Sequence, residues 1–242
     1  MGTDPFSICK SGFTCPRGND PRKLGSLLIA LLLGGCSAGP VSAPVRLDPA
    51  RFEPDIRAFE QADVKSPPAQ GGVLFVGSSS IRLWKLDESF PGLHALNRGF
   101  GGSQIADCTA FVERIVLPYR PTRIFFYAGD NDIAAGKSPK VLLEDWQRFR
   151  KSVHAKLLDA RIVFLSVKPS PNRWTLWPQA KQANALIEAD CAADPRLKYL
   201  DVAAPMLDAT GAPRAELFLD DHLHMNAEGY KLWAAIVAPH LQ

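Results

Sequence analysis

The chain alternates between short apolar runs and longer stretches in which apolar positions recur every three or four residues. A short apolar run bounded by glycine, proline or polar residues is typical of a strand buried on both faces. Such runs predict five strands, over 73–76, 93–96, 123–128, 161–167 and 197–202. The first run stops at Gly77 and leads into three serines, and the second leads into a glycine-rich segment.

Amphipathic stretches lie between these runs. They predict helices over 48–64, 104–117, 138–158, 179–192 and 227–241, with a short helical turn at 81–86. Asp48 and Asn226 stand at N-cap positions, and Pro49 and Pro139 stand at first helical positions. Strands and helices therefore alternate, which predicts an α/β fold: a three-layer α/β/α sandwich on a five-stranded parallel sheet, flavodoxin-like, without internal repeats or a second domain.

The first 36 residues differ from the rest of the chain. A basic pair precedes the apolar run 24–33, which is too short to span a bilayer as a helix, and the segment ends in Leu33-Gly34-Gly35-Cys36. This ending resembles a bacterial lipobox, which implies that Cys36 carries a lipid and begins the mature protein. An ordinary cleaved signal or a short membrane anchor is the alternative.

The expected organisation follows from this segment. We expect a signal segment at 1–36, a small-residue, proline-containing tether at 37–47 and a globular domain at 48–242. The resemblance to lipoproteins implies attachment to the membrane by a lipid anchor only. Because Ser37 rather than Asp follows Cys36, it also implies a place in the bacterial cell envelope, on the outer membrane facing the periplasm.

Composition and charge narrow the class of protein. The chain is 46% hydrophobic and 22% charged, which suits one soluble domain with a full core. Outside residues 1–36, Lys and Arg number 24 and Asp and Glu 23, of 28 and 25 in the whole chain. No basic stripe or charge run is left, so we expect no nucleic-acid partner. Cys108 and Cys191 are the only cysteines after Cys36; export permits a bridge, but two buried thiols are the favoured interpretation.

Polar residues follow three of the predicted strands. Segment 77–80 follows the first, 99–102 the second and 129–132 the third, and 221–224 precedes the last helix. The carboxyl ends of parallel strands meet at one edge of the sheet, where open α/β sheets bind their ligands. Each segment alone is also good turn chemistry. All four in this order indicate a single site.

The four segments resemble the sequence blocks of the SGNH (GDSL-type) hydrolase family, over roughly residues 73–241. Gly77-Ser78-Ser79 aligns with the family's Gly-Asp-Ser block. This implies that Ser79 is the nucleophile. Ser78 stands where the family has Asp, and because Ser78 and Ser80 flank Ser79, only the alignment of Gly77 singles out Ser79. The second block implies an oxyanion role for Gly102. Gly129-Asp130-Asn131-Asp132 matches the family's Gly-x-Asn-Asp block, which implies the same role for Asn131.

The last segment, Asp221-His222-Leu223-His224, matches the family's Asp-x-x-His block. The match implies that His224 is the general base and Asp221 its partner. Imidazole suits proton removal from a serine hydroxyl, and the three-residue spacing lets the carboxylate fix its tautomer. A metal site is the alternative for the His-x-His pair, but no third ligand stands at a matching distance. We expect no metal and no cofactor, and His222 at the site mouth or facing solvent.

The resemblance implies a serine esterase that hydrolyses short-chain acyl esters, chiefly acetyl, on a small-molecule or glycan-linked substrate. There are two alternatives. An acyltransferase would use the same residues, whereas an inactive relative that binds envelope glycans would be expected to have lost one of Ser79, Asn131, Asp221 and His224, and none is missing. The connections after the first three strands are short, so we expect an open cleft without a lid. Trp174 and Trp177, in segment 168–178, either wall a pocket or cover the edge of the core.

Overall fold

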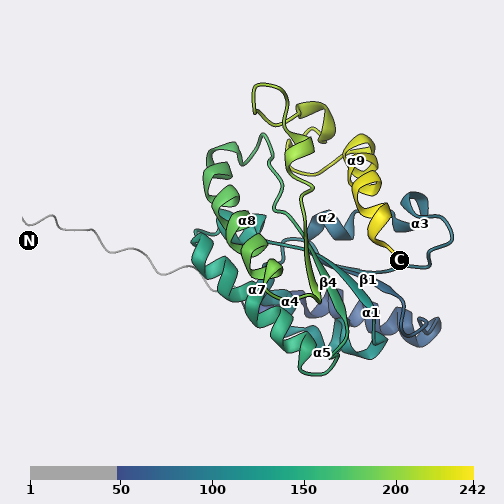
Figure 1. The fold of residues 1–242 in the computed structure, drawn as a ribbon. Helices are drawn as coiled ribbons and strands as arrows, with labels where there is room; N and C mark the ends of the chain where they lie inside the picture. Colours follow the sequence, from purple (N-terminus) through teal and green to yellow (C-terminus); the bar gives the residue numbers. More distant parts are fainter. Residues whose placement is uncertain (1–47) are drawn as a thin grey trace, which may run out of the picture. The chain divides into compact units, whose positions relative to one another are not determined.

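A parallel five-stranded sheet, in the order β2-β1-β3-β4-β5, forms the middle layer of the fold (Figure 1). The computed structural model describes residues 48–242; the predicted signal segment 1–36 with Cys36 and the tether 37–47 lie outside the described residues. The strands are β1 (Val73–Gly77), β2 (Leu96–Gly99), β3 (Arg123–Tyr127), β4 (Arg161–Leu165) and β5 (Leu197–Leu200). The predicted α/β fold on a five-stranded parallel sheet is confirmed.

Helices alternate with the strands. They are α1 (Glu53–Lys65), α2 (Ser79–Arg82), α3 (Leu86–Ser89), α4 (Ile105–Ala110), α5 (Val112–Ile115), α6 (Asp130–Ala134), α7 (Pro139–His154), α8 (Trp177–Ala192) and α9 (Ala227–Val237). Two 3₁₀ turns used below are η1 (Pro49–Phe52) and η3 (Trp174–Leu176). Among residues 48–242, none of these helices has both the length and the apolar character needed to cross a bilayer.

The sheet carries a separate apolar core on each face, because side chains alternate along a strand. Leu74 and Val76 of β1 belong to the core beneath α1, α4, α5, α7 and α8. Phe75, between them, belongs to the core beneath α2, α3 and α9. The strand β1 is therefore apolar on both sides, as its continuous run predicted, and Figure 1 shows α9 and α3 on the opposite side of the sheet from α7 and α8.

The second strand differs from its prediction. The apolar segment 93–96 largely precedes β2, whose central residues Asn97 and Arg98 are polar. The Asn97 amide donates to the Ile81 carbonyl at 2.7 Å, and the buried Arg98 guanidinium donates to the Tyr119 hydroxyl at 2.8 Å. These partners come from distant segments, so a search for apolar runs misses this edge strand.

The predicted helix 104–117 is also different. It is two short helices, α4 and α5, separated at Phe111. The first packs against α7 and the second against α1, so the break lets each half follow its own neighbour. The predicted N-cap at Asp48 is confirmed, because its carboxylate accepts from the Ala50 N–H at 2.9 Å, although the first turn is η1 rather than α-helix.

The two cysteines of the described domain are free and buried. Cys108 lies on α4 and Cys191 on α8, and no bridge joins them, which confirms the favoured interpretation. Burial raises the pKa of the Cys191 thiol to about 12. A buried thiol that stays protonated is a packing residue rather than a nucleophile.

Candidate active site

The serine run begins where β1 ends in a tight turn. Gly77 has φ 149°, and a Cβ there would lie 1.8 Å from the Tyr127 carbonyl oxygen of β3. Only glycine fits, because the strands approach so closely. The Ser78 N–H continues the pairing by donating to the same carbonyl at 2.9 Å. The chain then turns into α2, whose first residue is Ser79.

Burial distinguishes the three serines from one another. Ser78 is 0% and Ser80 2% exposed, whereas Ser79 is partly exposed. The Ser79 hydroxyl lies 3.0 Å from Nε2 of His224, a residue 145 positions further along the chain. Ser79 is therefore the serine that meets the predicted base.

His224 is held by Asp221 on its other side. The ring Nδ1 lies 2.5 Å from Oδ2 of Asp221, while Oδ1 accepts the N–H groups of Leu223 and His224 at 2.9 Å each. These hydrogen bonds, the one from the ring foremost, hold the pKa of Asp221 well below its usual range. An ionised carboxylate only accepts, so Nδ1 carries a proton, and Nε2 of an uncharged ring is then free to accept from the Ser79 hydroxyl.

The segment that carries His224 is fixed by contacts with the loop after β4. The buried Lys168 ammonium donates to the Leu223 carbonyl at 2.9 Å, and the Asn172 N–H donates to the His222 carbonyl at 3.0 Å. Burial lowers the pKa of Lys168. His222 has φ 55° and is exposed, which agrees with the prediction that it lies at the mouth or faces solvent.

Gly102 and Asn131 are brought together through Ser103. The Asn131 amide nitrogen donates to the Ser103 carbonyl at 3.1 Å, and the Ser103 hydroxyl donates to the carbonyls of Phe100 and Gly77 at 2.9 and 3.3 Å. The turns after β1, β2 and β3 therefore meet at this point. Within residues 48–242 the N–H of Gly102 donates no hydrogen bond, and neither does that of Ser79.

Arg173 is a site residue that the sequence did not reveal. Its Nη2 donates to Oδ1 of Asn131 at 3.0 Å, and its Nη1 lies 3.2 Å from Oδ2 of Asp130. The guanidinium thus holds the oxygen of the Asn131 amide, so the amide nitrogen points away from Arg173. Arg173 stands in the loop after β4, and an isolated loop arginine carries no sequence signal of its partner.

Asp132, the last residue of the same turn, has a structural role. It is fully buried and accepts the Ile105 N–H of α4 at 3.2 Å and the Lys137 ammonium at 2.8 Å. Burial raises its pKa to about 6. The carboxylate therefore fixes α4 against the turn that carries Asn131.

The two tryptophans of the loop after β4 have different surroundings. Trp174 is 36% exposed, and its ring stacks on that of Trp177 with centroids 6.2 Å apart. Trp177 packs against the core beneath α7 and α8. Trp177 therefore covers the edge of the core and also lines the hollow beside Arg173, whereas Trp174 is the more exposed of the two rings.

Comparisons with known proteins identify a family and a fold for this chain. The model described as the GDSL-like Lipase/Acylhydrolase family matches residues 80–232. No curated protein matches the sequence. A solved structure from Streptococcus pneumonia, provisionally described as a platelet activating factor, is 19% identical with a TM-score of 0.72, over 80% of this chain and 94% of that one.

Two further structures are similar. A GDSL-like lipase from Bacteroides thetaiotaomicron is 19% identical with a TM-score of 0.63, over 80% of this chain and 97% of that one. A mutant acetyl esterase with an acetate ion is 15% identical with a TM-score of 0.57, over 71% of this chain and 96% of that one. At these identities the structures show a common fold, whereas the family model matches more than half of the sequence. The chain therefore belongs to the GDSL-like lipase/acylhydrolase family and is an SGNH-type ester hydrolase.

Proposed function

We propose that the protein hydrolyses short-chain acyl esters, chiefly acetyl esters, with Ser79 as nucleophile, His224 as general base and Asp221 as its orienting partner. One observation carries the proposal: Nε2 of His224 lies 3.0 Å from the Ser79 hydroxyl while Nδ1 lies 2.5 Å from Asp221. This is hydrogen-bond reach for proton transfer, with the ring tautomer already fixed.

The chemistry follows from these contacts. The Ser79 oxygen attacks the ester carbonyl carbon as its proton passes to Nε2 of His224. The tetrahedral intermediate collapses, the C–O bond to the alcohol breaks, and the alcohol leaves with the proton from Nε2. Water then attacks the acyl-serine with His224 again as base, which releases the acid and restores Ser79.

The negative charge on the carbonyl oxygen needs donors that are present before the reaction. We assign this role to the N–H groups of Ser79 and Gly102, which donate to no other described group, and to the second amide hydrogen of Asn131. The arrangement is supported by Arg173, whose bond to Oδ1 orients the amide.

The proposed acyl specificity rests on the size of the hollow beside Arg173. This hollow, which Asp130 and Trp177 also line, has a volume of only about 20 Å³. A long acyl chain that finds no apolar wall loses roughly 0.8 kcal/mol of binding free energy for each CH₂ that stays in water. On the other side, Leu83 and Leu219 line a groove of about 570 Å³ between α2, α3 and α9. Because His224 delivers its proton to the leaving alcohol, we place the bulkier alcohol part there.

A series of p-nitrophenyl esters tests the specificity. Acetyl to butyryl esters should be hydrolysed well, and kcat/KM should fall at about eight carbons and beyond. Acetylated glycans then test the alcohol part. A kcat/KM that climbs steadily from acetate to the C12 and C16 esters would show that the protein is a long-chain lipase and refute the short-chain assignment.

A further inference from the structure

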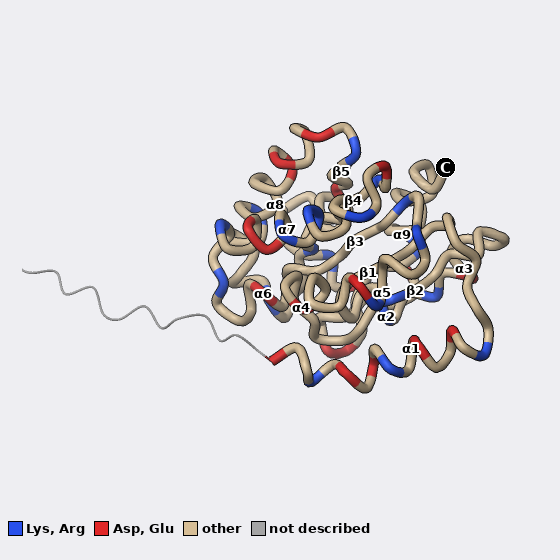
Figure 2. Tube along the Cα trace, turned by 90° about the horizontal axis from the view of Figure 1, so that it is seen from below, with Lys and Arg blue, Asp and Glu red and all other residues tan. Residues whose placement is uncertain are grey.

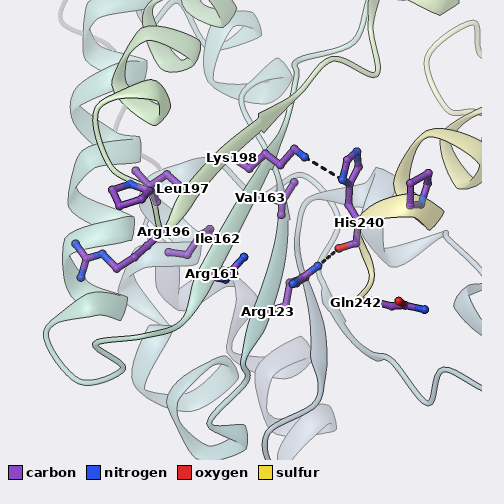
Figure 3. A pocket seen from close by; sticks show the side chains of 11 residues that line it. Arg123, Arg161, Ile162, Val163, Arg196, Leu197, Lys198, His240 and Gln242 are labelled. Carbon is purple, nitrogen blue, oxygen red and sulfur yellow. Dashed lines mark hydrogen bonds between the residues drawn. The ribbon is translucent and has the colours of Figure 1, made fainter.

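A second hollow lies at the opposite edge of the sheet, where β3, β4 and β5 begin. Figure 2 shows Lys and Arg positions beside β4, and Figure 3 shows the hollow from close by. It has a volume of about 280 Å³ and is lined by Arg123, Arg161, Arg196, Lys198 and His240 together with apolar residues and Gln242. Since the proposed active site lies at the carboxyl ends of the strands, this hollow is separate from it.

Strand register places three of the cations on one face of the sheet. Arg123 is the direct neighbour of Arg161 on β4, and Lys198 is the direct neighbour of Val163. Val163 belongs to the core beneath α9, so alternation along the strands sends Arg123, Arg161 and Lys198 toward that face. The segment after α9, which carries His240, closes the hollow there (Figure 3).

His240 joins two of these cations. Arg123 donates to its backbone carbonyl, and the Lys198 ammonium lies 3.0 Å from its Nδ1 (Figure 3). An ammonium group has no lone pair to accept with, so Nδ1 is the acceptor and the ring is neutral, with its proton on Nε2. Burial and the charges of Lys198 and Arg123 lower the pKa of His240, which keeps the ring neutral.

The cations lack a negative partner. Arg196 forms a pair with Asp194 at 2.7 Å, but no Asp or Glu side chain lines the hollow, and Arg123, Arg161 and Lys198 form no ion pair within residues 48–242. Burial and the charge of Arg161 lower the pKa of Arg123. Three like charges thus converge on one concave space, and no acidic side chain there is paired with any of them, an arrangement that a bound anion would stabilise.

We propose that this hollow binds a phosphoryl group, either free or as part of a larger molecule. Two arginines from neighbouring strands offer planar forks that match phosphate oxygens, Lys198 supplies a point charge, and the Nε2–H of His240 is a further donor. Three positive charges favour a dianion over a single carboxylate. The proposal is independent of the proposed ester hydrolysis.

Calorimetric titration of the full chain with inorganic phosphate tests the proposal, at constant ionic strength maintained with NaCl so that screening does not change. The test variant is Arg161→Gln with Lys198→Gln. The matched control is Lys140→Gln with Lys181→Gln, which removes the same charge from exposed positions on α7 and α8. Losing a single charge-assisted hydrogen bond weakens binding roughly tenfold or more, so the test variant should bind at least tenfold more weakly and the control like the wild type.

Two further arms distinguish the source of the phosphoryl group. Vesicles of phosphatidylglycerol are compared with vesicles of phosphatidylcholine, using wild type and test variant with the same N-terminus, so that a lipid anchor contributes equally. Binding of inorganic phosphate that the test variant loses supports a soluble phosphorylated ligand. Phosphatidylglycerol binding that the test variant loses, without phosphate binding, supports a headgroup. If wild type and test variant behave alike in every arm, the proposal is wrong.

Discussion

Replacing Arg173 by Met should slow the chemical step without removing any proposed catalytic group. In the structure, Arg173 fixes Oδ1 of Asn131 at 3.0 Å and is itself fixed by Asp130 at 3.2 Å. Methionine keeps much of the apolar stem and lacks the fork. The Asn131 amide then loses the partner that orients its nitrogen toward the proposed oxyanion.

The contacts set the size of the effect. Losing the amide donor itself, as in Asn131→Ala, should cost about 10²–10³ in kcat. A hydrogen bond from a charged donor is worth about 1.5–3 kcal/mol, but Asn131 keeps its 3.1 Å bond to the Ser103 carbonyl, which would repel Oδ1 of a flipped amide. The loss for Arg173→Met should therefore be roughly 10-fold to 100-fold, smaller than for Asn131→Ala, and mainly in kcat rather than KM.

The assay is a double-mutant cycle on p-nitrophenyl acetate, with melting followed by circular dichroism. In the Asn131→Ala background, Arg173→Met should cost little more, because the group that it positions is already gone. Arg57→Met, which removes a 68% exposed guanidinium from α1, is the control and should leave kcat unchanged. Two outcomes would show that Arg173 does not act by orienting the amide. One is that Arg173→Met lowers kcat as much in the Asn131→Ala background as in wild type; the other is that Arg173→Met alone lowers kcat more than Asn131→Ala alone.

Three further predictions address other parts of the account. His224→Ala should lose nearly all esterase activity in a p-nitrophenyl acetate assay while His222→Ala keeps most of it; the reverse result, or inactivation by a chelator, would favour the metal interpretation. Lys168→Met should lower kcat/KM about tenfold, because it removes a charge-assisted bond to the Leu223 carbonyl beside the base; unchanged kcat/KM would contradict this role. Labelled palmitate should enter the full-length protein and be lost on Cys36→Ser, whereas an unlabelled wild type would exclude a lipid anchor.

The fold could be predicted because parallel strands covered on both faces leave a pattern that needs no knowledge of partners. The runs at β1, β3 and β4 were found because each of these strands has two apolar faces. At the edge, β2 was misplaced because Asn97 and Arg98 are stabilised by hydrogen bonds to remote residues, and hydrophobicity does not register such bonds.

Part of the candidate site could also be predicted from the sequence. Turn residues at strand ends have fixed places relative to the sheet, so Ser79 and Asn131 could be expected together, and His224 was added by the Asp-x-x-His motif before the last helix. No sequence pattern indicates Arg173 or Lys168, because their contacts join loops that the fold alone brings together. The residues proposed to do the chemistry were therefore readable from local motifs, whereas the residues that orient them were not.

Labelling with a fluorophosphonate, followed by mass spectrometry of the tryptic peptides, tests the central claim most directly. Its premise is that Ser79 alone of the three serines is both accessible and within 3.0 Å of the His224 ring. The account predicts one adduct, on Ser79, that disappears in Ser79→Ala together with ester hydrolysis, while circular dichroism and melting barely change. An adduct on Ser78 or Ser80, or a Ser79→Ala protein that still hydrolyses p-nitrophenyl acetate, would contradict it.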